Sequence, residues 1–344
     1  MTVAINARAA VRGEIGGVER VAREMAARLP ALEPGRYRVV RPRARLAHRA
    51  GHLWEQVALP LTTRECELVY SPAHLAPLAS HRNVVMISDA AALRHPDWYG
   101  RSYAAYQRRV LPAVARGARL VIAPSEFSRA EIAELMGVEP GHVAVVPHGV
   151  SERFSPDADP EPARADLSLA GDYALYVGTR ISRKNVAALR DAQRALSEHG
   201  VELVAAGSGR AYMAAGEQPP ARLLGYVDDG LLPGLYAGAR ALLMPSLYEG
   251  FGLPCLEAMA SGTPVVASDR AALPETCGDA ALIVDPDDPA AVAGAAVAAA
   301  VDESARGRLI AAGLARAAEL TWERTARRTN ALIGGLLQRG DLSS

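Results

Sequence analysis

Residues 239–269 read ARALLMPSLYEGFGLPCLEAMASGTPVVASD, and this stretch decides the fold class. It begins with the pattern of a buried strand, continues through a glycine-containing loop, and then gives a short helix and a second apolar strand. Pro254 suits the first position of that helix, and Gly262 suits a left-handed residue that ends it. A strand, loop, helix and strand in this order are typical of an α/β protein with a parallel sheet.

The same alternation extends over the rest of the chain. Most apolar runs are continuous rather than alternating, which predicts strands covered on both faces. The predicted strands are residues 3–6, 37–40, 68–70, 84–87, 120–123, 144–146, 174–177, 202–205, 241–244, 264–267 and 282–284. Helical patterns lie between several of them, at 18–29, 128–136, 186–199 and 256–260.

The length of 344 residues suits about two domains. The Pro- and Asp-rich stretch 154–166 has little to bury and is interpreted as an interdomain linker. We therefore expect one α/β domain over residues 1–160 and a second over 167–321. A further helix, predicted over residues 322–341, follows the last strand.

The composition excludes several classes of protein. The 38 basic residues balance the 38 acidic ones, so nothing predicts a nucleic-acid partner. Cys66, Cys255 and Cys277 lack a CxxC spacing and are interpreted as free thiols in a reducing compartment. The N-terminal residues do not resemble a signal peptide, and no apolar run is long enough to span a bilayer. A cytoplasmic protein is expected.

The loop of residues 246–253 is predicted to bind a ligand. Gly250 and Gly252 allow a close approach of the backbone, and the amides of Gly252 and Leu253 precede a helix N-terminus that favours phosphate or sugar oxygens. Glu249 and Glu257 are expected to lie on either side of the ligand. The alternative is that Glu257, placed near the first helical turn, only complements the helix dipole while Glu249 is solvated.

The segment EGFGLPCLE (249–257) resembles the E-x7-E motif of the retaining glycosyltransferases of family 4, which have the GT-B fold. Other segments resemble the family in the same order. These are GGVERV (16–21), APSEFSR (123–129), VPHGV (146–150), RFSP (153–156), VGTRISRKN (177–185), AAGSG (205–209), LGYV (224–227) and TWERTA (321–326). The resemblance covers nearly the whole chain. It implies two Rossmann-like, doubly wound domains that face a cleft, with the C-terminal helix crossing back to the first domain.

The resemblance also implies roles for the loop residues. Glu257 would bind the nucleotide ribose, because a carboxylate accepts two hydroxyl hydrogen bonds well. Glu249 would contact the donor sugar. The backbone amides of Phe251, Gly252 and Leu253 would hold sugar hydroxyls and the diphosphate.

The cations are expected in the segment 177–185. Lys184 is the only lysine among the 38 basic residues, and the resemblance assigns it to the donor diphosphate, where a compact ammonium acts as a point charge. The alternative is that a single lysine remains here by chance. Arg183 is the expected second cation, with Arg180 as a substitute, and Gly178 is expected to line the donor site. Many relatives have arginine where this chain has Thr179.

Further residues are expected around the ligand. Gly16 and Gly17 open a helix after the first strand and are expected to face the diphosphate or the acceptor. The backbone of Val227 and the loop at 246–247 are expected to flank the base.

The chain departs from the family after the fourth strand, where many relatives have His-Asp and this chain has Ser88-Asp89. Asp89 is expected to act at the acceptor or the transferred sugar. His95 is interpreted as a structural or rim residue rather than a replacement for the missing histidine.

No bound metal is predicted. The triplets 157–159 and 285–287 have the form D-x-D, but both lie in proline-rich connections that are typical of solvated turns. The cations of this site are expected to be side chains and helix N-termini. The arginines of segment 36–49 (Arg36, Arg38, Arg41, Arg43, Arg45 and Arg49) suggest contact with an anionic membrane; a solvated loop is the alternative.

Taken together, the sequence predicts a retaining glycosyltransferase without a tightly bound cofactor. The donor would be a nucleoside-diphosphate hexose, with GDP-mannose favoured over a UDP-sugar, and the acceptor a sugar, a lipid-linked glycan or a small molecule. Two other interpretations stay open: a related sugar-nucleotide enzyme such as an epimerase, and a sugar-binding protein without catalysis.

Overall fold

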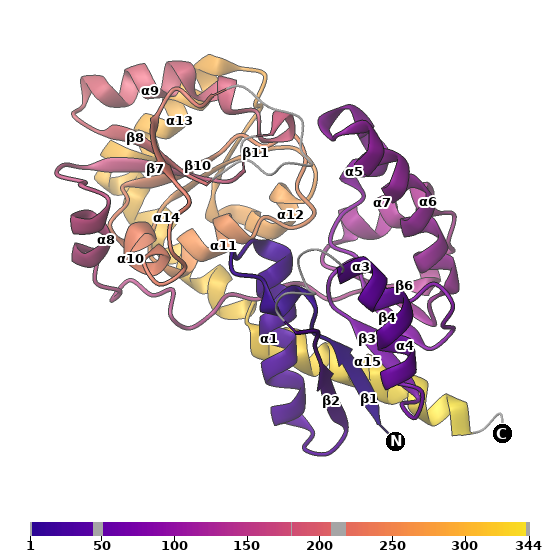
Figure 1. Cartoon of the computed structure of the whole chain (residues 1–344). Coiled ribbons are helices and arrows are strands. Elements are labelled where there is room, and N and C mark those ends of the chain that lie inside the picture. The colour runs from indigo at the N-terminus through magenta and orange to yellow at the C-terminus, as the bar shows by residue number, and fades with distance from the viewer. Residues whose placement is uncertain (1, 44–50, 180, 208–217, 342–344) are drawn as a thin grey trace. The chain divides into compact units, whose positions relative to one another are not determined.

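The computed structural model of the protein describes residues 2–43, 51–179, 181–207 and 218–341, with side chains of the last helix described as far as Gln338 (Figure 1). Arg45, Arg49, Arg180 and Gly209, which the sequence singled out, lie outside these residues. The chain folds into two compact units. Unit 1 comprises residues 1–94, 104–148 and 322–344, and unit 2 comprises residues 95–103 and 149–321.

Unit 1 is built on a parallel sheet of six strands in the order β2-β1-β3-β4-β5-β6. The strands are β1 (Val3–Asn6), β2 (Tyr37–Val40), β3 (Leu68–Ser71), β4 (Asn83–Met86), β5 (Leu120–Ala123) and β6 (Val143–Val145). The helices are α1 (Gly17–Leu32), α3 (Gly51–Leu53), a π-helical turn (Trp54–Ala58), α4 (Leu59–Thr62), α5 (Ala91–Arg94), α6 (Arg101–Gly117, from residue 104 on), α7 (Glu126–Met136) and α15 (Trp322–Asp341).

The central strands of unit 1 are fully covered. All residues of β1, β3 and β4 are buried, as continuous apolar runs require for strands packed on both faces. The chain moves from β1 outward to β2 and then returns to β3 on the other side of β1. The order of the strands therefore reverses between β1 and β3, which makes this pair the switch point of a doubly wound sheet.

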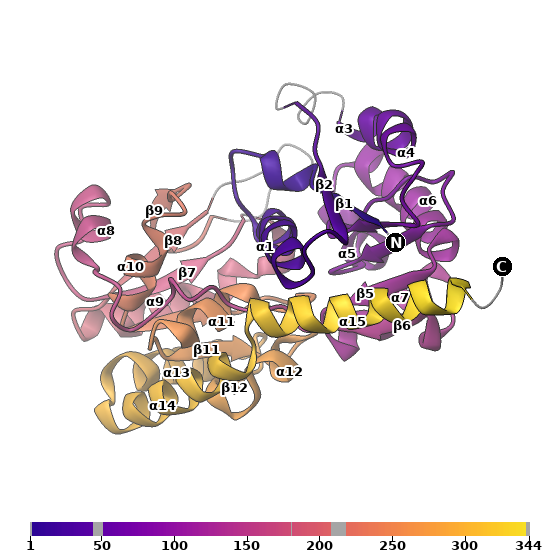
Figure 2. The ribbon, with the colours of Figure 1, turned by 90° about the horizontal axis from the view of Figure 1, so that it is seen from below.

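Helix α15 belongs to unit 1 although it ends the chain. It packs across α1 (Figure 2), and Trp322 at its start is fully buried. Asn330 Oδ1 accepts hydrogen bonds from Tyr37 Oη at 2.6 Å and Arg36 Nη1 at 3.2 Å. Thr325 Oγ1 donates to the carbonyl of Pro147 at 2.8 Å. These contacts attach the end of the chain to strands and loops formed from its first half.

Unit 2 repeats the architecture with a parallel sheet of six strands in the order β12-β11-β10-β7-β8-β9. The strands are β7 (Tyr173–Val177), β8 (Glu202–Ala206), β9 (Arg222–Gly225), β10 (Ala241–Met244), β11 (Val265–Ser268) and β12 (Leu282–Val284). The helices are α8 (Glu161–Asp166), α9 (Leu189–Glu198), α10 (Leu232–Ala237), α11 (Leu253–Ala260), α12 (Leu273–Cys277), α13 (Pro289–Val301) and α14 (Glu303–Glu319).

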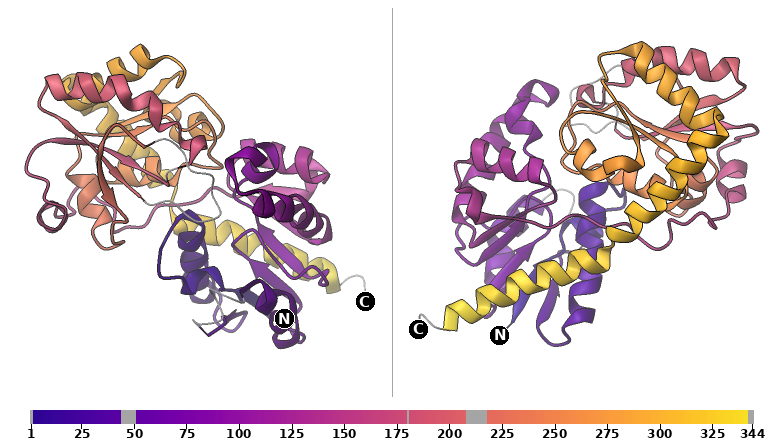
Figure 3. Two further views of the ribbon diagram at one scale, coloured as in Figure 1. Left: turned by 45° about the horizontal axis from the view of Figure 1, so that its top comes forward. Right: turned by 180° about the vertical axis from the view of Figure 1, so that it is seen from behind.

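Helices cover both faces of the unit 2 sheet (Figure 3). Side chains of α9 and α13 pack on one face in a core that includes Tyr176, Leu189 and Val266, while α11 and α12 pack against β10 and β11. The switch point lies between β7 and β10, because β8 and β9 extend from one side of β7 and the later strands from the other. The predicted α/β class and its doubly wound form are confirmed in both units.

Several predicted elements differ from the structure. The sequence missed β9, an edge strand in which Arg222 and Leu223 are exposed, so that it shows no buried apolar run. The predicted helix 186–199 is divided into a 3₁₀ turn (Val186–Ala188) and α9. The second half of the Pro- and Asp-rich stretch forms α8 and buries Ala163. Gly262 is in the left-handed conformation, with φ of 71°, as predicted.

Candidate active site

The candidate site of unit 2 lies at the carboxyl ends of β7 and β10, on either side of the switch point. Lys184 ends a 3₁₀ turn (Ser182–Lys184) that follows β7, and Glu249 lies in the loop after β10. Lys184 Nζ is 2.5 Å from Glu249 Oε1, and Arg183 Nη1 is 3.1 Å from Oε2. Each oxygen of this buried carboxylate therefore has its own cation, and the three side chains named in the sequence come together.

The protonation of this cluster follows from burial and pairing. Burial alone would raise the pKa of Glu249, but the Lys184 ammonium and the Arg183 guanidinium outweigh it and lower the pKa to about 2. Burial lowers the pKa of Lys184, and the Glu249 carboxylate opposes that shift. Glu249 is thus an ionised acceptor at neutral pH and is unsuited to donate a proton.

Arg183 also fixes the loop that carries Glu249. Its Nη1 donates to the carbonyl of Tyr248 at 2.7 Å, and the amide of Leu247 donates to the carbonyl of Arg183 at 2.8 Å. Ser268 Oγ donates to the carbonyl of Ser246, which ties the same loop to the end of β11. The loop is therefore held by its neighbours at three successive carbonyl or amide positions.

Glycines make room for Lys184. A Cβ at Gly178 would lie 2.7 Å from the hydroxyl of Tyr176 and 3.1 Å from Cε of Lys184. A Cβ at Gly207, whose φ is +133°, would lie 2.0 Å from the carbonyl oxygen of Gly178. Both glycines are required by this packing, and Gly178, predicted to line the donor site, lies directly against the lysine side chain.

Helix α11 begins as the sequence predicts, with Gly252 as its N-cap in the left-handed region (φ +102°) and Leu253 as its first residue. A Cβ at Gly252 would lie 2.7 Å from Cδ2 of Leu273, so this position also requires glycine. The carbonyl of Phe251 accepts a hydrogen bond from Thr276 Oγ1 at 2.5 Å. The segment 251–253 is therefore a rigid entry to the helix.

Glu257 lies in the second turn of α11, whereas an acidic residue that complements the helix dipole lies in the first turn. The first turn of α11 contains no acidic residue, and Glu257 is the fifth residue of the helix. Its side chain is buried, and Tyr236 Oη donates to Oε2 at 3.0 Å. The alternative, in which Glu257 only complements the helix dipole and Glu249 is solvated, does not fit, because Glu257 lies beyond the first turn and Glu249 is buried.

Tyr236 is a residue that the sequence did not identify. It lies in α10, its carbonyl accepts from Thr263 Oγ1 at 2.6 Å, and its ring meets that of Phe154 edge-on with centroids 5.7 Å apart. Phe154 belongs to the RFSP segment, so that segment supports Tyr236. No local pattern predicts this role, because a tyrosine in a short apolar helix resembles an ordinary core residue.

The loop after β9 contains the residues predicted to flank a base. Gly225 ends β9 in the left-handed region (φ 71°), and its carbonyl accepts from the amide of Gly207 at 2.7 Å. Val227 is buried two residues later. This loop lies at the same carboxyl-terminal edge of the sheet as the loop after β7, because the strands are parallel.

Two predicted sites lie in unit 1. Gly16 caps α1 and Gly17 is its first residue; Glu19 Oε2 accepts from the amide of Gly16 at 3.1 Å, while Oε1 pairs with Arg12 Nη1 at 3.0 Å. Asp89 is half-buried, and its Oδ1 accepts from the amide of Ala91 at 3.0 Å, at the start of α5. Asp89 thus has a local structural contact in addition to its predicted role.

His95 belongs to unit 2 and is packed among aromatic rings. It stacks on Trp98 with centroids 3.9 Å apart, and its ring meets Tyr248 edge-on at 5.9 Å. Tyr248 immediately precedes Glu249. His95 therefore lies beside the loop that carries Glu249.

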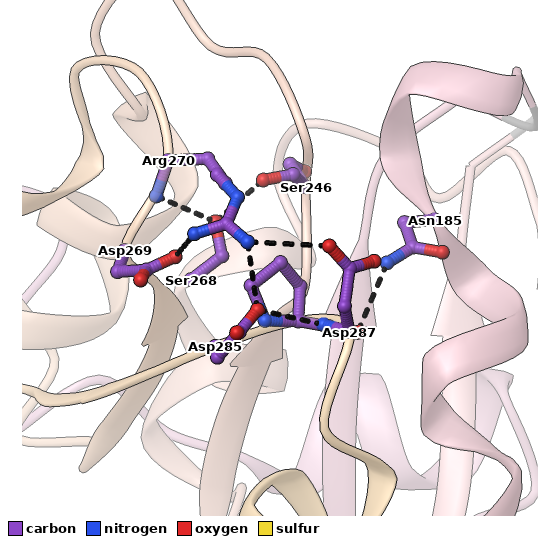
Figure 4. A network of polar contacts seen from close by, with 8 residues as sticks. Asn185, Ser246, Ser268, Asp269, Arg270, Asp285 and Asp287 are labelled. Atoms are coloured by element: carbon purple, nitrogen blue, oxygen red, sulfur yellow. Dashed lines mark hydrogen bonds and ion pairs between the residues drawn. The ribbon is translucent and has the colours of Figure 1, made fainter.

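The acidic triplets form ordinary turns. Asp285 and Asp287 both pair with Arg270 Nη2, at 2.7 and 3.2 Å, and Asp269 pairs with Nη1 (Figure 4). Asp159 Oδ1 accepts from the amide of Glu161 at 3.0 Å. Within the described ranges, no group of three or more His, Cys, Asp and Glu side chains is arranged to hold a metal ion.

Helix α15 and the other described helices are too short or too polar to cross a bilayer. One exposed apolar stripe is present on the helical segment 51–62 of unit 1. Leu53, Val57 and Leu61 recur every four residues and are 66%, 52% and 68% exposed. All three cysteines are free, as predicted, and all three are buried.

Two doubly wound units in one chain are typical of the GT-B class of proteins, and comparison with solved structures supports this class. Sucrose-phosphate synthase from Thermosynechococcus elongatus is 20% identical, with a TM-score of 0.75 over 98% of this chain and 100% of that one. HepE of Anabaena, solved with UDP and glucose, is 18% identical, with a TM-score of 0.71 over 98% of this chain and 99% of that one. At these identities the likeness establishes the fold alone.

Sequence comparison gives the family. The model of glycosyl transferases group 1 matches residues 171–302, and that of glycosyltransferase family 4 matches residues 70–154. The O-antigen chain mannosyltransferase B of Escherichia coli is 33% identical over 74% of this chain and 71% of its own length. Further curated relatives match over shorter stretches, and this chain spans about half of their length. The chain belongs to the group 1 glycosyltransferases of family 4, and it is a transferase.

Proposed function

We propose that the protein transfers a hexose from a nucleoside-diphosphate sugar to an acceptor hydroxyl, with retention of the anomeric configuration. The observation that carries this proposal is the buried cluster of Lys184, Arg183 and Glu249 at the switch point of unit 2. A doubly wound sheet binds its ligand at this place. A donor diphosphate needs cations in a site of low dielectric, and this cluster supplies two.

Lys184 and Arg183 act on the leaving diphosphate in this proposal. As the sugar–phosphate bond breaks, negative charge accumulates on the phosphate oxygens, and preorganised cations stabilise that charge without further rearrangement. Glu249 holds both cations in place before the donor arrives. It then accepts hydrogen bonds from hydroxyls of the donor sugar, as the resemblance to the family implies.

The entry of α11 and Glu257 hold the remainder of the donor. The rigid segment 251–253 presents the amide groups that precede a helix N-terminus, where partial positive charge favours sugar and phosphate oxygens. Glu257 accepts from the ribose hydroxyls, with Tyr236 fixing one of its two carboxylate oxygens. Asp89, Gly16 and Gly17 of unit 1 serve the transferred sugar or the acceptor.

The proposed stereochemistry is retention by front-side attack. The acceptor hydroxyl approaches the face from which the diphosphate departs, and a departing phosphate oxygen takes its proton. Glu249 has no proton to give at neutral pH because its pKa is lowered to about 2. This supports a mechanism in which Glu249 binds charge and hydroxyls rather than acting as a general acid.

GDP-mannose is the proposed donor, and glycan biosynthesis the proposed context. Support comes from the Escherichia coli relative, whose name is that of an O-antigen mannosyltransferase, and from an O-antigen mannosyltransferase of Salmonella typhimurium. The UDP and glucose bound to HepE concern a protein of 18% identity and do not decide the base. The three buried free thiols support a reducing compartment such as the cytoplasm.

The exposed stripe of Leu53, Val57 and Leu61 supports peripheral contact with an anionic membrane. Arg38 lies beside its end, since Arg38 Nη2 donates to the carbonyl of Thr62. Apolar side chains flanked by arginine are typical of surfaces that bind at a bilayer interface. Sedimentation with vesicles containing anionic phospholipid tests this. Binding that survives the triple change of these residues to serine would contradict it.

The test of the proposed function is a donor screen. Purified protein is incubated with GDP-mannose, UDP-glucose, UDP-galactose and UDP-N-acetylglucosamine, each with a panel of glycoside acceptors, and released nucleoside diphosphate is measured. We expect release of nucleoside diphosphate with GDP-mannose. We also expect an α-linked product, identified by the one-bond carbon–proton coupling at the anomeric carbon in NMR. A product of inverted configuration would refute retention. Donor binding without release in every combination would refute glycosyl transfer and favour a sugar-binding protein.

A further inference from the structure

A second polar cluster lies at the switch point of unit 1, where no role has been assigned. Asn6 ends β1 and Ser71 ends β3, so the two residues meet at the carboxyl edge of the sheet. Asn6 Nδ2 donates to Ser71 Oγ at 3.2 Å, and both residues are buried. This is the position in unit 1 that corresponds to the Lys184 cluster in unit 2.

Glu55 approaches this edge from the π-helical turn Trp54–Ala58. Its side chain is 1% exposed, and Asn6 Nδ2 donates to Oε1 at 2.6 Å. Nε of the buried Arg8 lies 3.4 Å from the same oxygen. The Asn6 amide and the Arg8 guanidinium thus both contact Oε1 of Glu55. Oε2 has no hydrogen-bond partner among the described residues.

Glu55 Oε2 is the unusual atom of this cluster. It is buried, and within the described part of the chain no group lies within hydrogen-bonding distance of it; Nδ1 of His52 lies 4.0 Å away. Leaving such an oxygen without a partner costs about 1–3 kcal/mol or more. A π-helical turn often marks a functional site because it displaces a side chain from its α-helical position. Both observations indicate that Glu55 faces a ligand.

Two partly exposed aromatic side chains, His52 and Tyr106, lie near Glu55 and are together named its aromatic entrance. The side chain of His52 is 56% exposed, Tyr106 is 37% exposed, and their ring centroids lie 5.6 Å apart. The charges of Arg8 and Arg12 both act on Glu55. The entrance therefore combines a carboxylate oxygen, guanidinium groups and aromatic faces.

We propose that Glu55, Arg8 and the aromatic entrance of His52 and Tyr106 bind a sugar of the acceptor through two neighbouring hydroxyls. Glu55 Oε2 accepts from one hydroxyl, and a guanidinium donates to the oxygen of the other. The C–H face of the ring packs on Tyr106. A carboxylate with one free oxygen and a nearby guanidinium match a diol, which offers donors and acceptors together. The assignment of an acceptor sugar to this site rests on the proposed glycosyl transfer.

The experiment measures sugar binding separately from turnover. The methyl α-glycosides of mannose, glucose, galactose and rhamnose are titrated into the full chain without nucleotide, with saturation-transfer NMR as the readout. We expect at least one to bind the native protein and Glu55→Gln to weaken it roughly tenfold to a hundredfold, as expected for losing a charged hydrogen bond. The control is Glu65→Gln, which makes the same chemical change at an exposed position of unit 1.

Three outcomes decide the proposal. It is overturned if none of the four glycosides binds the native protein, or if Glu55→Gln binds as tightly as Glu65→Gln. Should Glu55→Gln fail to fold, Tyr106→Ala at the half-exposed entrance takes its place, with the same expected weakening. Nucleoside diphosphate release from GDP-mannose is recorded in parallel. If the native protein releases nucleoside diphosphate but the variants bind the sugar with unchanged affinity, this sugar site alone is refuted. If the native protein releases no nucleoside diphosphate, the proposed function is refuted.

Discussion

Glu249 and Glu55 are buried carboxylates at equivalent places, the switch points of two sheets with the same topology, yet their environments are opposite. Glu249 has one cation on each oxygen, and its pKa is lowered to about 2. Glu55 has its partners on one oxygen only, and burial raises its pKa against the opposing effect of Arg8. The same fold therefore supports a preformed charge cluster in unit 2 and an incomplete one in unit 1.

The contrast extends to other titratable groups. Burial lowers the pKa of His148 to about 3 and lowers that of His74, so these two histidines of unit 1 are neutral in the folded state. The Glu249 cluster of unit 2 keeps its buried charges by pairing them, whereas His74 and His148 of unit 1 are buried in the neutral form. Removing a charge is thus expected to have its largest effect in unit 2, and adding a proton its largest effect in unit 1.

The strongest test of the comparison is Lys184→Ala. It leaves Glu249 with Arg183 alone and removes a cation from the proposed diphosphate site. We expect kcat/KM for the donor to fall roughly a hundredfold to a thousandfold, as for the loss of one group that stabilises a developing charge. The control Arg36→Ala removes a partly exposed cation of unit 1 and is expected to change kcat/KM less than about twofold. Equal effects of the two changes would refute the role of Lys184.

A second test adds volume instead of removing charge. Gly178→Ala places a methyl group 2.7 Å from the hydroxyl of Tyr176 and 3.1 Å from Cε of Lys184, and we expect it to lower the free energy of unfolding by roughly 2–3 kcal/mol. Tyr176→Phe alone is expected to be nearly neutral, because its hydroxyl has no hydrogen-bond partner among the described residues. Denaturant unfolding of the double variant should recover part of the loss; a loss equal to that of Gly178→Ala alone would contradict the clash.

Mild acid tests unit 1. The folded pKa of His148 is about 3 and its ordinary value is 6.5, so below pH 6.5 the unfolded chain binds a proton that the folded chain does not. The stability that the neutral His148 contributes is fully present above pH 6.5 and is lost as the pH falls toward 3. At pH 5 the loss in the free energy of unfolding is about 2 kcal/mol. We expect His148→Gln to flatten the fall in stability between pH 7 and 5, measured by denaturant titration. An unchanged slope would show that this histidine is protonated when folded.

Glu249 gives the matching expectation for unit 2 at lower pH. Its pKa is lowered from 4.5 to about 2, so its contribution to stability is present above pH 4.5 and is lost only as the pH falls toward 2. Hydrogen exchange of the amides of β4 in unit 1 and of β10 in unit 2 follows the two regions separately. We expect unit 1 to lose structure first, and simultaneous loss would contradict the comparison.

A smaller effect is expected at Tyr236. Tyr236→Phe removes the hydroxyl that donates to Glu257 Oε2 and leaves the ring in place. One such hydrogen bond contributes about 1–2 kcal/mol, so we expect the donor KM to rise about fivefold to thirtyfold with kcat nearly unchanged. A fall in kcat at constant KM would indicate that Glu257 acts on the reacting centre and not on the ribose.

The smallest effect is expected at Arg270, the half-exposed guanidinium of Figure 4. It has three acidic partners, but solvent screens exposed pairs. Arg270→Ala is expected to lower the free energy of unfolding by less than about 1 kcal/mol and to leave donor KM unchanged. A larger loss would show that a solvated turn of unit 2 contributes as much as its buried cluster.

Much of this architecture is predictable from the sequence because it is local. Continuous apolar runs marked most strands, and the loop with Gly250, Gly252 and Pro254 marked the start of α11 correctly. The solitary Lys184 indicated the cation of the candidate site, and the structure brings it to Glu249. Each of these signals lies within a few residues of the chain.

The remaining features depend on contacts between distant residues. Tyr236 reaches Glu257 from another helix, and Glu55 meets Asn6 across 49 positions of sequence. Neither pairing leaves a local pattern, since tyrosine in α10 resembles core and glutamate in a helix resembles solvated surface. The edge strand β9 was missed for a related reason: its exposure removes the apolar signal on which strand prediction depends.

The burial of Lys184 also gives this chain a built-in spectroscopic reporter. It is the only lysine in the sequence, and its side chain is 6% exposed and held against Glu249. Reductive methylation with isotopically labelled formaldehyde therefore introduces a single side-chain dimethylamine resonance, located at the proposed diphosphate site. Its chemical shift reports the charge around one nitrogen atom. A nucleotide that binds at this site protects the amine from methylation, so donor binding can be detected without an assay of sugar transfer.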